Sequence, residues 1–140
     1  YDTIQNSFKN EVLELSNTNK IILIYPIPEI GWNVRKKIYL QWINRNTSSN
    51  FDLKYITTSY KVYQNRTKSS FKLLDSIQGN NIHRVYPHSL FCDTTIKDRC
   101  ITHDNKDIYY FDDDHTLLKG TEMINDLIIK KIEKIEFKSN

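Results

Sequence analysis

Residues 20–25 read KIILIY, and Pro26 follows them directly. A continuous run of isoleucine and leucine, with no alternation of polar residues, is typical of a strand that is covered on both faces. We therefore expect this stretch to form a central parallel strand. Residues 82–86 (IHRVY) form a second short run that also ends at a proline, Pro87, and we expect this strand to pair beside the first.

Helical patterns surround these two strands. Apolar residues recur at helical spacing over residues 2–15, 33–44, 59–77 and 117–135, the last being the clearest helix. We expect the third helix to be interrupted or bent near 65–69 and to be terminated by Gly79 and Asn80. Residues 108–111 predict a third extended segment, 44–50 a polar loop, and 51–60 either a strand or a connection. Helices that alternate with buried strands indicate an α/β structure with parallel strands.

Composition and charge describe one ordinary globular domain. The 140 residues are 39% hydrophobic and 26% charged, with 3 Gly and 3 Pro. The net charge of +3 comes from cations scattered along the chain, so we expect no nucleic-acid partner. No stretch of about 18 uncharged apolar residues occurs, which excludes a membrane-spanning helix within these residues. The same residues show no signal-peptide pattern.

Cysteine and histidine usage bears on redox state and metals. Cys92 and Cys100 are the only two cysteines, and they lie eight residues apart. This spacing is compatible with a small disulfide loop and equally with two reduced thiols. A zinc site would need more thiols or better-spaced histidines than the four in this chain. We expect no metal site.

The loops after the strands are where functional groups should lie, because binding sites in parallel α/β folds form outside the carboxyl ends of the strands. The loop richest in ionisable side chains is DDDH, residues 112–115. Asp112 can turn back onto the imidazole of His115, accept its Nδ1 proton and leave Nε2 free as a general base. An alternative is that the aspartates are favourable charges at a helix start and His115 is a bystander.

Three segments together carry a family resemblance. Residues 109–115 (YYFDDDH), followed by Gly120 and a long amphipathic helix, closely resemble the final block of SGNH hydrolases. They look most like the SGNH domain of acyltransferase-3 membrane proteins, which O-acetylate bacterial surface glycans. Residues 24–31 (IYPIPEIG) and 85–92 (VYPHSLFC) resemble two further segments of that domain. The resemblance runs from about residue 20 to 132 and implies a flavodoxin-like, three-layer α/β fold with a mostly parallel sheet.

The resemblance also implies roles for single residues. His115 would be the general base and Asp112 its orienting partner, while Asp113 and Asp114 would be charges at the helix start or around the site. Where the family usually has Leu followed by Ser or Thr, this chain has Thr116 and then Leu, so we expect Thr116 to cap the final helix.

The family's nucleophile is missing from this sequence. It lies in a Gly-Asp-Ser block near the start of the domain, and two other blocks supply a Gly and an Asn to the oxyanion hole. No Gly-Asp-Ser occurs here. Ser89, beside His88, has no nucleophile-elbow setting, and we expect His88 to line the strand end without a catalytic role. We therefore expect residues 1–140 to form the C-terminal part of a single SGNH-type domain, N-terminally incomplete and inactive alone.

The leading hypothesis is a part of an enzyme that, in the complete protein, O-acylates or deacylates a bacterial surface glycan through a serine ester, without a cofactor. The resemblance implies lipopolysaccharide or another surface polysaccharide as acceptor and an upstream acyltransferase membrane domain. It also implies a Cys92–Cys100 disulfide and a periplasmic or extracytoplasmic location, tethered to the inner membrane. The alternative is a non-catalytic glycan-binding or protein-interaction module on the same scaffold.

Overall fold

A computed structural model describes residues 2–44 and 54–136. The predicted polar loop over 44–50 lies, apart from its first residue, outside the described residues. Along the chain the elements are α1 (Asp2–Ser16), β1 (Ile21–Ile24), α2 (Val34–Ile43), β2 (Thr57–Ser59), α3 (Tyr60–Asp75), β3 (Ile82–Val85), the 3-10 turn η1 (Pro87–Leu90), β4 (Arg99–Ile101) and α4 (Leu118–Glu136).

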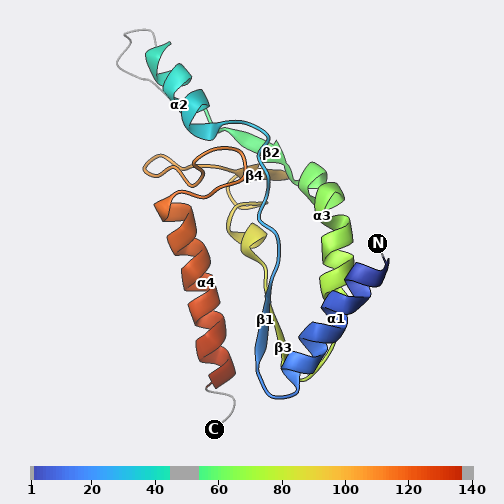
Figure 1. Cartoon of the computed structure of the whole chain (residues 1–140). Helices are drawn as coiled ribbons and strands as arrows, with labels where there is room; N and C mark the ends of the chain where they lie inside the picture. Colours follow the sequence, from blue (N-terminus) through green and yellow to red (C-terminus); the bar gives the residue numbers. More distant parts are fainter. Residues whose placement is uncertain (1, 45–53, 137–140) are drawn as a thin grey trace.

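The two strands predicted before Pro26 and Pro87 pair in parallel. Ile21 lies opposite Ile82, and Ile24 lies opposite Val85. Helices α1 and α3 cover one face of this pair and α4 covers the other (Figure 1). The predicted α/β class is therefore confirmed, with a small parallel sheet between two helical layers.

One prediction about β1 is wrong. Within residues 2–44 and 54–136, β1 pairs with β3 alone, so it is not a central strand. Leu23 and Tyr25 are buried against α1 and α3, but Ile24 is 49% exposed on the opposite face. The physical reason is that α4 packs against β3 and covers β1 incompletely. The apolar run indicates that one face of the strand is buried. It does not indicate that the other face is buried as well.

Helix α3 differs from its predicted form. It runs without interruption from Tyr60 to Asp75, and Ser59 caps it by accepting the N–H of Val62 at 3.4 Å. Helix α3 ends at Asp75, before Gly79. Ile77 lies two residues beyond this end and is completely buried in the core, so the chain leaves the helical path there. The guanidinium of Arg84 donates to the Ile77 carbonyl there. An interruption at 65–69 is therefore absent, and the predicted glycine cap is wrong.

A second, smaller sheet lies beyond the carboxyl ends of β1 and β3. In it β2 and β4 are antiparallel, with Thr57 opposite Ile101. The region left open over 51–60 thus contains a strand. Cys92 and Cys100 are buried and joined as a disulfide, the pairing that the family resemblance implies. Closing so short a loop contributes about 2–3 kcal/mol in the chain-entropy model.

Candidate active site

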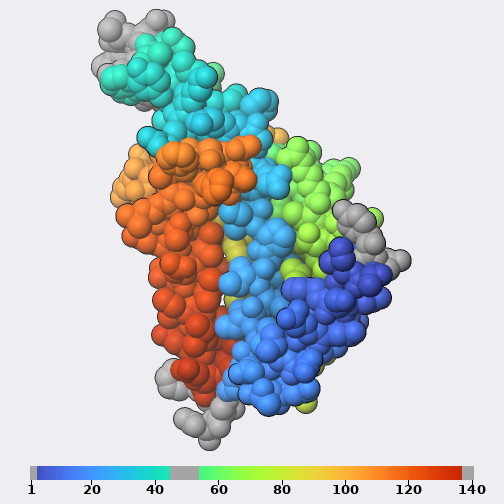
Figure 2. All heavy atoms as spheres, viewed as in Figure 1, coloured from blue at the N-terminus to red at the C-terminus, as the bar shows by residue number. Residues whose placement is uncertain are grey.

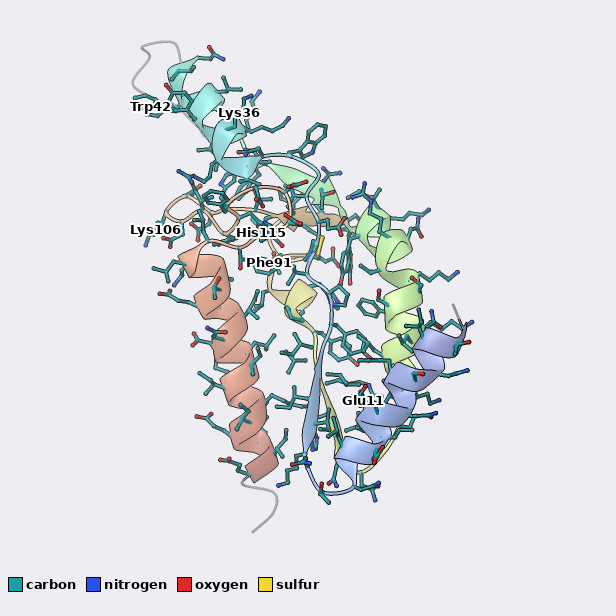
Figure 3. All side chains as sticks on the ribbon, viewed as in Figure 1. Glu11, Lys36, Trp42, Phe91, Lys106 and His115 are labelled. Atoms are coloured by element: carbon teal, nitrogen blue, oxygen red, sulfur yellow. A yellow bond between two sulfur atoms is a disulfide. The ribbon has the colours of Figure 1, made fainter. Side chains whose placement is uncertain are left out.

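The segment DDDH lies in a tight turn at the carboxyl end of the parallel strands, directly before α4 (Figure 3). The N–H of Phe111 donates to the carbonyl of His115 at 2.8 Å, and Tyr110 and Thr116 form an antiparallel bridge. Tyr109 and Tyr110 are buried in the core beneath the turn. The base of the turn is therefore fixed by backbone hydrogen bonds and by packing, while its tip reaches solvent.

Asp112 shapes this turn. Its Oδ1 accepts the backbone N–H of His115 at 2.8 Å and of Asp114 at 3.1 Å, the pattern of an Asx turn. These bonds, the one from His115 first, stabilise the charged carboxylate and lower the pKa of Asp112 to about 2. Asp112 is therefore ionised at any ordinary pH.

The imidazole of His115 lies against two carboxylates. Its Nδ1 is 3.0 and 3.1 Å from the two oxygens of Asp112, and 2.9 Å from Oδ1 of Asp114. The hydrogen bond to Asp112 and the two negative charges raise the pKa of His115 above its ordinary value of 6.5. The His115 side chain is 74% exposed, so the Nε2 edge, opposite these contacts, reaches solvent. A neutral imidazole here donates from Nδ1 and keeps Nε2 free to accept a proton.

The structure thus brings together the two residues singled out from the sequence and adds a third. The sequence interpretation placed Asp114 among charges at the helix start or around the site, whereas its carboxylate also contacts the Nδ1 atom of His115. The two residues are neighbours in sequence, and the turn holds their side chains against each other. The sequence held no separate signal for this contact.

The loop that follows β1 supports the turn from one side. The N–H of Ile30 donates to the carbonyl of Asp113 at 2.7 Å, and Ile30 itself is buried. The next residue, Gly31, has a φ of 73°, a left-handed conformation that glycine adopts without strain. The segments IYPIPEIG and DDDH, far apart in the sequence, therefore meet at the candidate site.

In the loop that follows β3, the side chains of Ser89 and His88 make contacts within the fold. Ser89 lies on η1 and its hydroxyl donates to the carbonyl of Tyr86 at 2.7 Å. His88 packs among aromatic rings, with ring centroids 5.4 Å from Tyr63 and 5.6 Å from Phe71. Burial lowers the pKa of His88. Both side chains thus have contacts within the fold, and the expectation that neither takes part in the chemistry stays a prediction.

A family comparison bears on this site. The family model described as the SGNH domain (fused to AT3 domains) matches residues 1–130. The chain belongs to this SGNH family. Family membership indicates a function of the acyl-transfer or hydrolase type. The match also includes α1, which precedes the segments that carry the resemblance. No curated protein and no solved structure matches the chain. In the described part of this SGNH chain, no helix is long and apolar enough to span a membrane.

The SGNH chain begins its last helix without the expected cap. The hydroxyl of Thr116 pairs with the hydroxyl of Thr121 at 2.9 Å, and α4 begins at Leu118. The helix start is instead held by Tyr109, whose carbonyl accepts the N–H of Leu117 at 2.8 Å. The predicted Thr116 cap is therefore wrong, and a backbone contact with the strand-like segment before the turn takes its place.

Gly120 is packed against the same carbonyl. A Cβ atom at this position would overlap the carbonyl oxygen of Tyr109 and lie 3.2 Å from Cβ of Thr116. We expect Gly120→Ala to destabilise the fold by about 1–3 kcal/mol through overpacking, although alanine is the better helix former by about 1 kcal/mol. Urea unfolding of the two proteins measures this difference.

Gly79→Ala is the matched control for that substitution. A Cβ at Gly79 would meet Cγ1 of Ile82 at 3.3 Å, which a shift of a few tenths of an ångström relieves, and we expect a change of less than about 1 kcal/mol. Equal stability of Gly120→Ala and the unchanged chain would show that α4 moves away from Tyr109 without cost.

The cluster at the turn does not make a convincing metal centre. Asp112, Asp114 and His115 could each offer one ligand atom, all within 4.8 Å of one another. The histidine atom facing the carboxylates is Nδ1, which serves as their hydrogen-bond donor, so a metal ion would have to replace its proton. Another histidine, His103, is buried, and its Nε2 accepts the N–H of Ile56 at 3.1 Å. We therefore assign no metal to these residues.

Proposed function

We propose that this chain supplies the histidine and aspartate of an SGNH acyl-transfer site, which in the complete protein O-acylates or deacylates a bacterial surface glycan. The observation that carries the proposal is the pairing of His115 Nδ1 with ionised Asp112 while the rest of the imidazole is open to solvent. A general base has to be held in one tautomer in this way, with its second nitrogen facing the reacting group.

The serine comes, in this proposal, from residues outside these 140, as do the oxyanion-hole donors. Serine Oγ attacks the acyl carbonyl while its proton passes to Nε2 of His115. Asp112 stabilises the imidazolium through Nδ1–H, and Nε2 returns the proton to the departing donor group. The resulting serine ester is attacked by a glycan hydroxyl, or by water in deacylation. Nε2 takes the proton of that attacking group and then returns it to serine Oγ.

Substrate and location follow from the same family relation. We propose that the acceptor is lipopolysaccharide or another surface polysaccharide, and that an acyltransferase membrane domain upstream delivers the acyl group. The family description, which names fusion to AT3 domains, supports this arrangement. The Cys92–Cys100 disulfide supports an extracytoplasmic site, since disulfides persist in oxidising compartments. The scattered cations still give no reason to expect a nucleic-acid partner.

A fluorophosphonate probe tests the proposal, because it forms a covalent bond only with a serine that a base has activated. We expect the complete protein to be labelled on one serine outside the 140 residues. The isolated 140-residue chain should remain unlabelled, since the Ser89 hydroxyl donates to the carbonyl of Tyr86 and not to a base. Mass spectrometry of peptides locates the label.

Two results would count against the proposal. Labelling of Ser89 would place the nucleophile within this chain. A complete protein that is folded yet unlabelled, and that transfers no acyl group to its glycan, would favour the alternative of a binding or interaction module.

A further inference from the structure

A groove lies between α2 and the segment that leads into the catalytic turn. Its volume is about 610 Å³, within the usual range for ligand sites, and its walls include Arg35, Lys36, Tyr39, Trp42 and Phe111. Figure 2 shows α2 projecting from the body beside this segment. Phe111 immediately precedes Asp112, and its N–H donates to the carbonyl of His115, so one wall of the groove belongs to the catalytic turn itself.

The walls of the groove present aromatic faces to solvent. Tyr39 is 58% exposed and Trp42 is 50% exposed, whereas Phe111, 47% exposed, has the Arg35 guanidinium over one face of its ring. The rings of Tyr39 and Trp42 are stacked, with centroids 6.3 Å apart and planes 26° apart. Flat, partly exposed rings of this kind match the apolar C–H faces of pyranose rings, while the indole N–H and phenol hydroxyl can serve sugar hydroxyls.

The charge of the groove has one sign. Arg35 and Lys36 line it, and no acidic side chain does so among the described residues. The Arg35 guanidinium lies 4.8 Å above the centre of the Phe111 ring, which fixes a cation beside the catalytic turn. Charge-assisted hydrogen bonds to carboxylates are the strongest contacts that such cations make.

We infer that this groove is the acceptor subsite and that it binds an acidic glycan, a chain of sugars carrying carboxylates, with pyranose rings on Tyr39 and Trp42 and a carboxylate at Arg35 and Lys36. The inference rests on the proposed function for its catalytic meaning. Glycan binding does not require acyl transfer. Separate experiments therefore test the binding inference and the proposed catalysis.

Trp32, just before α2, and Lys37 of α2 lie outside the groove and supply matched controls. Trp32 is also about half exposed, but Lys37 Nζ lies 4.1 Å above the centre of its ring, so a cation already occupies that aromatic face. Lys36 and Lys37 are neighbours in sequence, yet only Lys36 lines the groove. Trp42 and Lys36 of the groove therefore each have a partner of the same type outside it, Trp32 and Lys37.

Tryptophan fluorescence gives the first test, because Trp32 and Trp42 are the only tryptophans of the chain. In Trp32→Phe the single remaining reporter is Trp42, and we expect its emission to change saturably when tetragalacturonate is added. In Trp42→Phe the remaining Trp32 should not respond. The neutral tetrasaccharide maltotetraose should bind at least about tenfold more weakly than tetragalacturonate, since it lacks the carboxylates.

Calorimetry with tetragalacturonate gives the second test. We expect Lys36→Gln to weaken binding by about tenfold and Lys37→Gln to leave it unchanged. Trp42→Ala should abolish detectable binding, whereas Trp32→Ala should not, and far-UV circular dichroism checks that both variants are folded. His115→Ala should bind as the unchanged chain does, which separates this inference from the proposed catalysis.

Three results would overturn the inference. Equal binding of maltotetraose would remove the assignment to acidic glycans. Equal responses of Trp32 and Trp42, or equal effects of the two lysine substitutions, would show that contact is not at this groove. A Trp42 emission that depends on protein concentration, without response to either sugar, would identify the groove as a contact between copies of the chain.

Discussion

His115→Ala in the complete protein is expected to lower kcat for acyl transfer by about 10³-fold or more, because it removes the group that takes the serine proton. The fold should be nearly unaffected. The side chain is 74% exposed and makes no contact with the core, so its loss leaves no cavity. Quantifying ester on the glycan, together with a thermal unfolding curve, measures both effects.

His83→Ala is the matched control for this substitution. His83 lies in β3, whose amino end is at the opposite end of the sheet from the catalytic turn. We expect acyl transfer to be unchanged in that variant. If His115→Ala kept the rate of the unchanged protein, the role of His115 as general base would be wrong, whatever the control did.

Asp112→Asn is expected to lower kcat by about 10²- to 10⁴-fold, which is large for a change of one atom type. The asparagine Oδ1 can still accept the N–H of His115 and of Asp114, so the turn should persist. What disappears is the negative charge that orients Nδ1–H and stabilises the imidazolium. An amide can also turn its NH₂ toward Nδ1 and thereby favour the wrong tautomer.

The same substitution should shift the pH dependence. Asp112 and then Asp114 raise the pKa of His115 above 6.5 in the unchanged protein. Below that pKa the imidazole is protonated and cannot accept the serine proton. The rate should therefore rise with pH through a midpoint above 6.5. In Asp112→Asn the pKa of His115 falls, and the midpoint of the residual activity should move to lower pH.

Titration of the imidazole by nuclear magnetic resonance in the 140-residue chain checks this shift without an activity assay. The pKa of His115 should fall most in Asp112→Asn, less in Asp114→Asn and least in the control Asp113→Asn, because Asp113 is the weakest of the three influences. An equal shift in all three variants would mean that the whole charge of the turn matters and the specific hydrogen bond does not.

Local patterns of the sequence were sufficient for the four helices, for β1 and β3, and for the contact between Asp112 and His115. An uninterrupted apolar run ending in proline predicts a buried strand because few other environments tolerate it, and residues 20–25 accordingly form β1. They pair in parallel with residues 82–86, a mixed segment that also ends at a proline. Asp112 and His115 are three residues apart within one turn, so their contact needs only local backbone geometry. For the same reason the loops that face the candidate site could be named in advance.

Everything that depends on what packs against an element was decided by the tertiary structure. Whether β1 is flanked on both sides depends on its neighbours, and α3 ends where Ile77 enters the core, whatever the position of the nearest glycine. Gly120 is required because the Tyr109 carbonyl lies where a Cβ would be. The groove beside the turn needs α2 and Phe111, far apart in the chain, to come together. Such contacts have no periodic signature in sequence, because they are set by which surfaces meet once the chain has folded.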